Sequence, residues 1–108
     1  MKLLSRAEEI VLMIIWKLRG NAYGVTIRQE IFETTGQKWS IGAIYAPLHR
    51  IEQKGLVTTI KGQPVPERGG RSKVFYEVTP EGKKALIEIK KVNEALWSDV
   101  PSIRLEEV

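Results

Sequence analysis

Every residue from Ile10 to Trp16 is apolar, and this run constrains the fold most. Ser5 and Glu8 match the S-x-x-E capping box, which predicts a helix from about Arg6 to Arg19. A helix with no polar face must be covered on both sides. A chain of 108 residues forms one small domain. One side of the helix can therefore meet the core, and we expect a second copy of the chain to cover the other.

Two further helices are expected before the middle of the chain. Residues 23–35 fit a helix whose inward side chains are Ile27, Ile31 and Phe32. Ser40 is a good N-cap for a third helix that ends at Gly55. Apolar residues recur there at helical spacing and predict one buried stripe, made of Ile41, Ile44, Leu48 and Ile51. Pro47 lies inside this helix and predicts a kink or an irregular first turn.

The second half of the chain predicts a hairpin followed by a helix. Residues 56–60 and 73–78 have strand-like patterns, and the Gly- and Pro-rich residues 61–72 between them predict an irregular tip. Thr79 followed by Pro80 is typical of a helix start, and this helix should end within residues 99–101. One of its faces is apolar and consists of Leu86, Ile89, Val92 and Leu96. The chain should thus be mainly helical, in the order helix, helix, helix, strand, strand, helix.

The net charge is concentrated in one stretch, from Ser40 to Tyr76. It contains six basic residues and two acidic ones, and the difference of +4 equals the net charge of the whole chain. A cationic field on a helix followed by a hairpin indicates a polyanionic partner, most simply nucleic acid.

Composition and residue spacing disfavour several other functions. The chain has no cysteine and one histidine, so disulfides and thiolate zinc sites are excluded and His49 is not expected to bind a metal. Acidic pairs such as Glu8-Glu9 fall on predicted surfaces and do not converge, so we expect no enzyme and no cofactor. The run Ile10–Trp16 is too short to span a bilayer, and no cleavage site follows it. We therefore expect a cytoplasmic protein with no membrane partner.

Four short motifs lie in order along residues 23–82. They are Tyr23-Gly24, then Gly42-Ala43-Ile44-Tyr45 with Gly55-Leu56, then Gly69-Gly70-Arg71 with Phe75-Tyr76, and Thr79-Pro80-Glu81-Gly82. In this order and at this spacing they resemble the PadR family of bacterial transcriptional regulators, which are winged helix-turn-helix proteins. Two positions depart from the family pattern: Ala46 separates the tyrosine from Pro47, and Val25 stands where an aromatic residue is common.

The resemblance implies a short member of the family that forms one structural unit. Residues 1–82 would be the winged helix-turn-helix DNA-binding domain, and residues 83–108 a dimerisation helix with a tail. The first and last helices would build the homodimer interface, for which the candidates are Ile10, Met13, Ile14, Leu86, Ile89, Val92 and Leu96. Relatives can enclose a flat apolar ligand at this interface, so Trp97 is a candidate contact for a small apolar effector. Plain dimer packing is the alternative for this side chain.

In a winged helix protein the third helix enters the major groove and the hairpin contacts the DNA backbone. The candidate DNA contacts are Ser40, Gly42, Ala43, Tyr45, Ala46, His49 and Arg50 on the third helix, and Lys61, Arg68, Gly70, Arg71 and Lys73 on the hairpin. Ser40 lies at a helix start, which suits a phosphate. For Arg50, contact with a base and contact with a phosphate both remain open.

The leading interpretation is a dimeric, sequence-specific DNA-binding transcriptional regulator. In the family's usual mode it would be a repressor, with double-stranded DNA of a pseudo-palindromic operator as its partner. The alternative is a winged-helix protein–protein interaction module without DNA binding, in which the basic face is only solvated surface.

Overall fold

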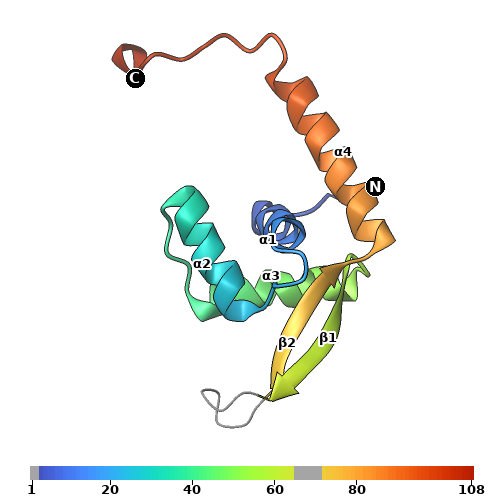
Figure 1. The fold of residues 1–108 in the computed structure, drawn as a ribbon. Coiled ribbons are helices and arrows are strands. Elements are labelled where there is room, and N and C mark those ends of the chain that lie inside the picture. The colour runs from blue at the N-terminus through green and yellow to red at the C-terminus, as the bar shows by residue number, and fades with distance from the viewer. Residues whose placement is uncertain (1–2, 65–71) are drawn as a thin grey trace.

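The computed structural model describes residues 3–64 and 72–108, and the element order is the expected one. The helices are α1 (Arg6–Lys17), α2 (Gly24–Thr35), α3 (Ile41–Gln53) and α4 (Pro80–Trp97), with a short 3₁₀ turn at Leu105–Glu107. The strands β1 (Val57–Pro64) and β2 (Ser72–Val78) form one antiparallel hairpin between α3 and α4. Helix α1 lies at the centre, in contact with the other three helices and β2 (Figure 1).

Local capping hydrogen bonds start the helices where the sequence predicts. Ser5 Oγ accepts the Glu8 N–H at 3.1 Å, and Glu8 Oε1 accepts the Ser5 N–H at 2.7 Å, which completes the capping box of α1. The Thr79 hydroxyl accepts the Gly82 N–H at 3.0 Å and donates to the Gly55 carbonyl at 2.6 Å. The second bond ties the start of α4 to the end of α3.

Helix α3 is continuous from its first turn, so the irregular first turn that the sequence allowed is wrong. Ser40 caps it by accepting the Ala43 N–H at 3.1 Å, and the helix runs through Pro47 without interruption. Proline removes one N–H, but the carbonyl that loses its partner belongs to the exposed Ala43, where water can replace it. At the other end, Gly55 has φ of 75° and the Leu56 N–H bonds to the Ile51 carbonyl at 2.9 Å, as in a Schellman motif.

The core lies between α1 and the inner faces of α2 and α3. Its largest fully buried side chains are Val11, Leu12, Ile15, Ile27, Ile31, Pro47, Ile44, Leu48 and Ile51. Two residues predicted to be buried are exposed: Phe32 by 43% and Ile41 by 62%. Phe32 follows Ile31 at about 100° around the helix, and α2 is covered on the side of Ile27 and Ile31 only. Ile41 lies in the first turn of α3, beyond the part of the helix that the core covers.

The hairpin is longer than the sequence predicts. Its register runs from Val57 opposite Val78 to Lys61 opposite Val74, and after an irregularity Pro64 pairs with Ser72. Residues 61–64 were expected in the tip, yet they continue β1. The Phe75 ring from β2 occupies the space beside Gly62 that a side chain would fill, which explains why a glycine fits this strand. The rest of the predicted tip, residues 65–71, lies outside the described residues.

Helix α4 leaves the body and carries the tail with it (Figure 1). It ends at Trp97, slightly before the predicted end, and the residues that follow are exposed. Among the residues described, none of the helices has the length and apolar character needed to cross a membrane.

Candidate nucleic-acid interface

The outer face of α3 carries small side chains near its start, beside the exposed Ile41 and the half-exposed Tyr45. Gly42, Ala43, Ala46 and His49 are exposed, as is Ser40 at the N-cap, while the opposite face is buried in the core. Small side chains allow the helix backbone to come close to another surface. This part of the predicted DNA-contacting set therefore lies together on one accessible face.

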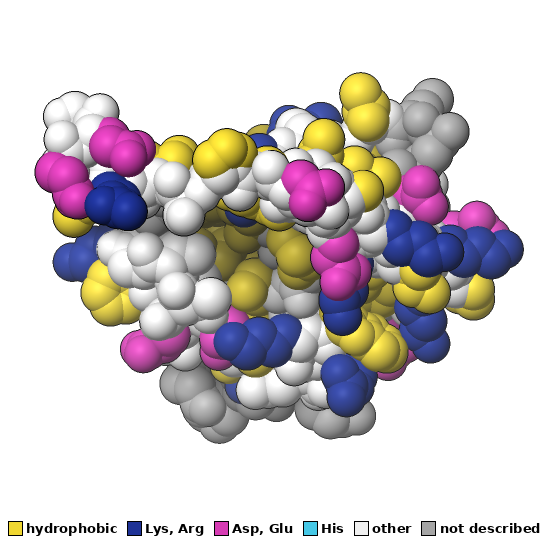
Figure 2. Space-filling model, turned by 90° about the horizontal axis from the view of Figure 1, so that it is seen from above, with side chains coloured by type: hydrophobic (Ala, Val, Ile, Leu, Met, Phe, Trp, Pro, Cys, Tyr) yellow, Lys and Arg dark blue, Asp and Glu magenta, His cyan; other side chains and the backbone are white. Residues whose placement is uncertain are grey.

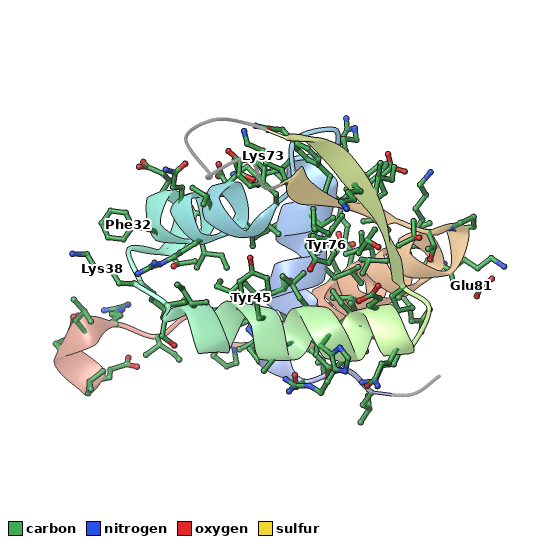
Figure 3. The ribbon with its side chains drawn as sticks, turned by 90° about the horizontal axis from the view of Figure 1, so that it is seen from below. Phe32, Lys38, Tyr45, Lys73, Tyr76 and Glu81 are labelled. Atoms are coloured by element: carbon green, nitrogen blue, oxygen red, sulfur yellow. The ribbon has the colours of Figure 1, made fainter. Side chains whose placement is uncertain are left out.

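Tyr45 is half-buried between α3 and α2. The residue is 46% exposed, and its side chain points from α3 toward the start of α2 (Figure 3). The hydroxyl lies against Gly24, in the space that a side chain at that position would need. This contact accounts for the Tyr23-Gly24 motif: the glycine makes room for the tyrosine of α3. The hydroxyl is thus held at the α2 start.

Tyr76 of β2 is buried beside the same helices. Burial raises the pKa of its hydroxyl, and the nearby Tyr45 hydroxyl and Glu52 carboxylate raise it further. Tyr76 is therefore neutral at physiological pH, as expected for an aromatic core residue. Its N–H also donates to the Ala22 carbonyl at 2.7 Å, which joins β2 to the segment before α2.

Arg50 does not stand free on the outer face of α3. Its Nε lies 3.5 Å from Oε2 of Glu8, and Lys54 Nζ lies 2.7 Å from the same oxygen. The Glu8 side chain is only 3% exposed. Burial opposes ionisation of this carboxyl, but hydrogen bonds from Lys54 and Ser5 outweigh it, so its pKa is below the ordinary value. Glu8 was expected on the surface, and this expectation is wrong: its side chain is buried because two cations far along the chain pair with it, and nothing local to α1 reveals those partners.

The hairpin supplies two of its predicted cations within the described residues. Lys61 is exposed on β1. Lys73 places its ammonium 4.6 Å from the centre of the Tyr23 ring, and that ring meets Phe75 edge to face at 5.3 Å. These contacts fix β2 against the start of α2. The other predicted hairpin contacts, Arg68, Gly70 and Arg71, lie outside the described residues.

An apolar groove runs between α1 and α4, on the side of the molecule away from α3. It has a volume of about 600 Å³, and its apolar lining consists of Met13, Trp16, Leu86, Ile87 and Ile89. Hydrophobic side chains gather around a hollow on this face (Figure 2). Trp97 is 71% exposed and does not line the groove.

The predicted interface residues divide into three groups by exposure. Ile14 and Ile89 are already buried within the protomer, so they can add little surface to a dimer. Ile10, Met13 and Leu86 are partly buried, whereas Val92 and Leu96 are exposed. Residues 3–64 and 72–108 contain no cluster of three or more potential metal-binding side chains.

Three helices followed by an antiparallel hairpin and a long helix form a winged helix-turn-helix protein, which confirms the expected fold. Residues 11–88 match the transcriptional regulator PadR-like family, and the chain belongs to this family.

Individual relatives agree with this assignment. A transcriptional regulator of Mycobacterium tuberculosis (Rv3488) is 35% identical over 78 residues, which is 72% of this chain and 68% of the relative. A putative transcriptional regulator of Thermoplasma acidophilum superposes with a TM-score of 0.63 at 27% identity, over 88% of this chain and 96% of the other. A PadR-like regulator of Bacillus cereus shares the fold, with a TM-score of 0.67 at 19% identity over 82% and 84% of the two chains.

Proposed function

We propose that this chain is a sequence-specific DNA-binding regulator that represses transcription as a homodimer. The observation that carries the proposal is the accessible outer face of α3, where Gly42, Ala43, Ala46 and His49 lie together with no acidic side chain among them. A helix with this face can enter the major groove and approach base edges closely. Family membership supports a role in transcription.

The hairpin provides the second contact. Lys61 and Lys73 are cations on its two strands, and Arg68, Gly70 and Arg71 belong to the segment that joins them. Such cations neutralise phosphates, which adds affinity without reading sequence. The protein would therefore combine base reading by α3 with backbone contacts by the hairpin.

The apolar groove between α1 and α4 supports the dimer. Val92 and Leu96 lie exposed on α4, and the groove itself is lined mainly by apolar side chains. Two copies joined along these helices would present two α3 helices to a pseudo-palindromic site in the cytoplasm, with half-sites about one helical turn apart. A small apolar effector bound at this interface, with Trp97 as a candidate contact, would change the spacing of the two DNA-binding faces and so control repression.

Selection of binding sites from random duplex DNA tests the proposal, followed by a salt titration on the selected site. We expect a twofold-symmetric consensus, and log K should fall by about 0.9 per phosphate contact for each tenfold rise in salt. Failure to enrich any sequence, together with an affinity that does not depend on salt, would contradict DNA binding.

A protein-binding module is the second candidate, and exposed apolar residues on α2 favour it. Val25 and Phe32 are exposed on this helix, and Phe32 points away from the body (Figure 3). Substitution of Lys61 and Arg71 by glutamine distinguishes the two functions. DNA-dependent repression should be lost in this double variant, whereas a module that binds only protein should keep its activity.

A further inference from the structure

A buried carboxylate joins α1 to two cations of α3. Glu8 accepts the Ser5 N–H through Oε1, and its Oε2 faces Lys54 Nζ at 2.7 Å and Arg50 Nε at 3.5 Å. One negative charge thus faces two positive ones, and a net positive charge remains at this place. The helix-capping role of Glu8 needs only the contact with Ser5. Pairing with the two cations is therefore a second role of the Glu8 side chain.

Most of the Arg50 guanidinium remains available for hydrogen bonds to another molecule. Its Nε faces Glu8, whereas its two terminal nitrogens form no ion pair with the residues that the structure describes. The side chain is 46% exposed. A guanidinium can present its terminal N–H groups as a fork that fits phosphate oxygens. Arg50 is thus paired with Glu8 through Nε, while nearly half of its side chain is open to solvent.

A shallow hollow extends along α3 from Arg50. It has a volume of about 450 Å³, and its lining includes Lys38, Ser40, Ala43, Ala46 and Arg50. The last four residues follow one stripe of α3 from its N-cap to its last turns. Ala7, Trp39 and Pro47 complete the lining, so the hollow follows α3 from the helix start to Arg50.

We propose that Glu8 is a positioning residue that holds Arg50, and with it Lys54, for contact with a DNA backbone phosphate. This inference rests on the proposed DNA-binding function and deepens it, because it assigns Arg50 to a phosphate and not to a base. The ion pair keeps the Arg50 guanidinium beside Glu8 and α1, and this placement favours a backbone phosphate over a base edge. Phosphate contacts of this kind set the position of α3 on the duplex.

Glu8 is unsuited to the opposite role of a phosphate mimic that DNA displaces. Its side chain is nearly inaccessible, and its two oxygens already accept hydrogen bonds from Ser5 and Lys54. An incoming phosphate can reach the outer edge of Arg50 without breaking these bonds. The carboxylate therefore stays in place when DNA binds.

The test compares two substitutions with the same change of charge, Glu8→Gln and Glu9→Gln. Glutamine is accepted at the third position of a capping box, so Glu8→Gln keeps the start of α1. Glu9 lies on the same turn, and its contact is with the exposed Arg6 at 3.5 Å, away from the cations of α3. Both variants gain one unit of positive charge, which by simple electrostatics strengthens DNA binding.

We expect Glu9→Gln to bind the selected duplex as tightly as the unchanged protein or slightly tighter. Glu8→Gln should bind about three- to tenfold more weakly in spite of its added positive charge, because a charge-assisted contact loses its orientation. Changes of DNA affinity in opposite directions in the two variants are the diagnostic result. Thermal unfolding of both variants shows whether the folded state is retained at the binding temperature.

Arg50→Ala provides the second measurement. This variant should bind all duplex sequences more weakly by the same factor. The slope of log K against log salt should become shallower by the amount of about one phosphate contact. Glu8→Gln should have little further effect in the Arg50→Ala background, because Glu8 acts mainly through this arginine. The inference is overturned if Glu8→Gln behaves as Glu9→Gln does, or if Arg50→Ala changes the preferred base at one position. If the unchanged protein binds no duplex at all, the proposed function fails first, and the inference fails with it.

Discussion

The hydroxyl of Tyr45 on α3 lies against Gly24, the first residue of α2, where any other amino acid would carry its Cβ atom. The two helices of the helix-turn-helix are thereby held together at one end. Tyr45 is also one of the predicted DNA contacts, and its hydroxyl lies beside the start of α2. The glycine and the tyrosine should therefore depend on each other.

The first prediction concerns Gly24→Ala. The new methyl group overlaps the Tyr45 hydroxyl, so we expect a loss of about 1–3 kcal/mol in the free energy of unfolding. In a Tyr45→Ala background the overlap is gone, and alanine should be neutral or stabilising by up to about 1 kcal/mol because of its helix propensity. Urea denaturation of the four proteins measures this coupling. Additive effects of the two substitutions would contradict the contact.

The second prediction contrasts two other helical glycines. At Gly82, in the first turn of α4, a methyl group would meet the backbone carbonyl of Leu56 and the Val78 side chain. Neither neighbour can move without disturbing the hairpin, so Gly82→Ala should destabilise the fold by about 1–3 kcal/mol or more. Gly42 has open space around it, and Gly42→Ala should raise stability by up to about 1 kcal/mol. Equal melting temperatures for the two variants would be inconsistent with this difference.

The third prediction is a dependence of stability on pH that arises from Glu8. Its pKa in the folded chain is below the ordinary value of 4.5, so the unfolded chain binds more protons near that pH. The stability that Glu8 contributes is therefore present above about pH 4.5 and is lost as the pH falls through the lower folded value. Urea denaturation in steps below neutral pH should show a smaller loss in Glu8→Gln than in the unchanged protein.

Glu9→Gln makes the same change of charge outside the ion pairs of Glu8 and is the matched control for this measurement. Part of the dependence should persist in Glu8→Gln, because the pKa of Glu30 is also lowered by its hydrogen bond from Lys17. If Glu8→Gln and the unchanged protein lose stability in parallel on acidification, the ion pairs of Glu8 do not contribute as described.

The fourth prediction concerns the proposed dimer. Leu96→Glu places a charge on the exposed apolar face of α4, and we expect the protein to sediment as a monomer with weaker DNA binding. Leu105→Glu is a suitable control because Leu105 is also exposed but lies in the tail. Analytical ultracentrifugation compares the two. A Leu96→Glu variant that remains dimeric would place the interface elsewhere.

The sequence alone determined the order of the elements and the starts of the helices. Ser5, Ser40 and Thr79 start helices because their hydroxyl oxygens accept hydrogen bonds from residues only three positions away. Gly55 ends α3 because its positive φ lets the chain turn within two residues. Such interactions are local, so a pattern of neighbouring residues predicts them. The order of elements and the family motifs followed from the same kind of information.

Only the tertiary structure decided which side chains meet across elements. Periodicity placed Ile41 and Phe32 with the core residues, but burial depends on whether another helix covers that part of the surface, and neither is covered. The same holds for Glu8, whose cations on α3 lie more than forty positions along the chain. Residue spacing describes the faces of one helix, whereas partners far apart in sequence are set by how the helices pack. The exposed side of α3 was thus predictable from its sequence, while the carboxylate that holds Arg50 became visible only in the fold.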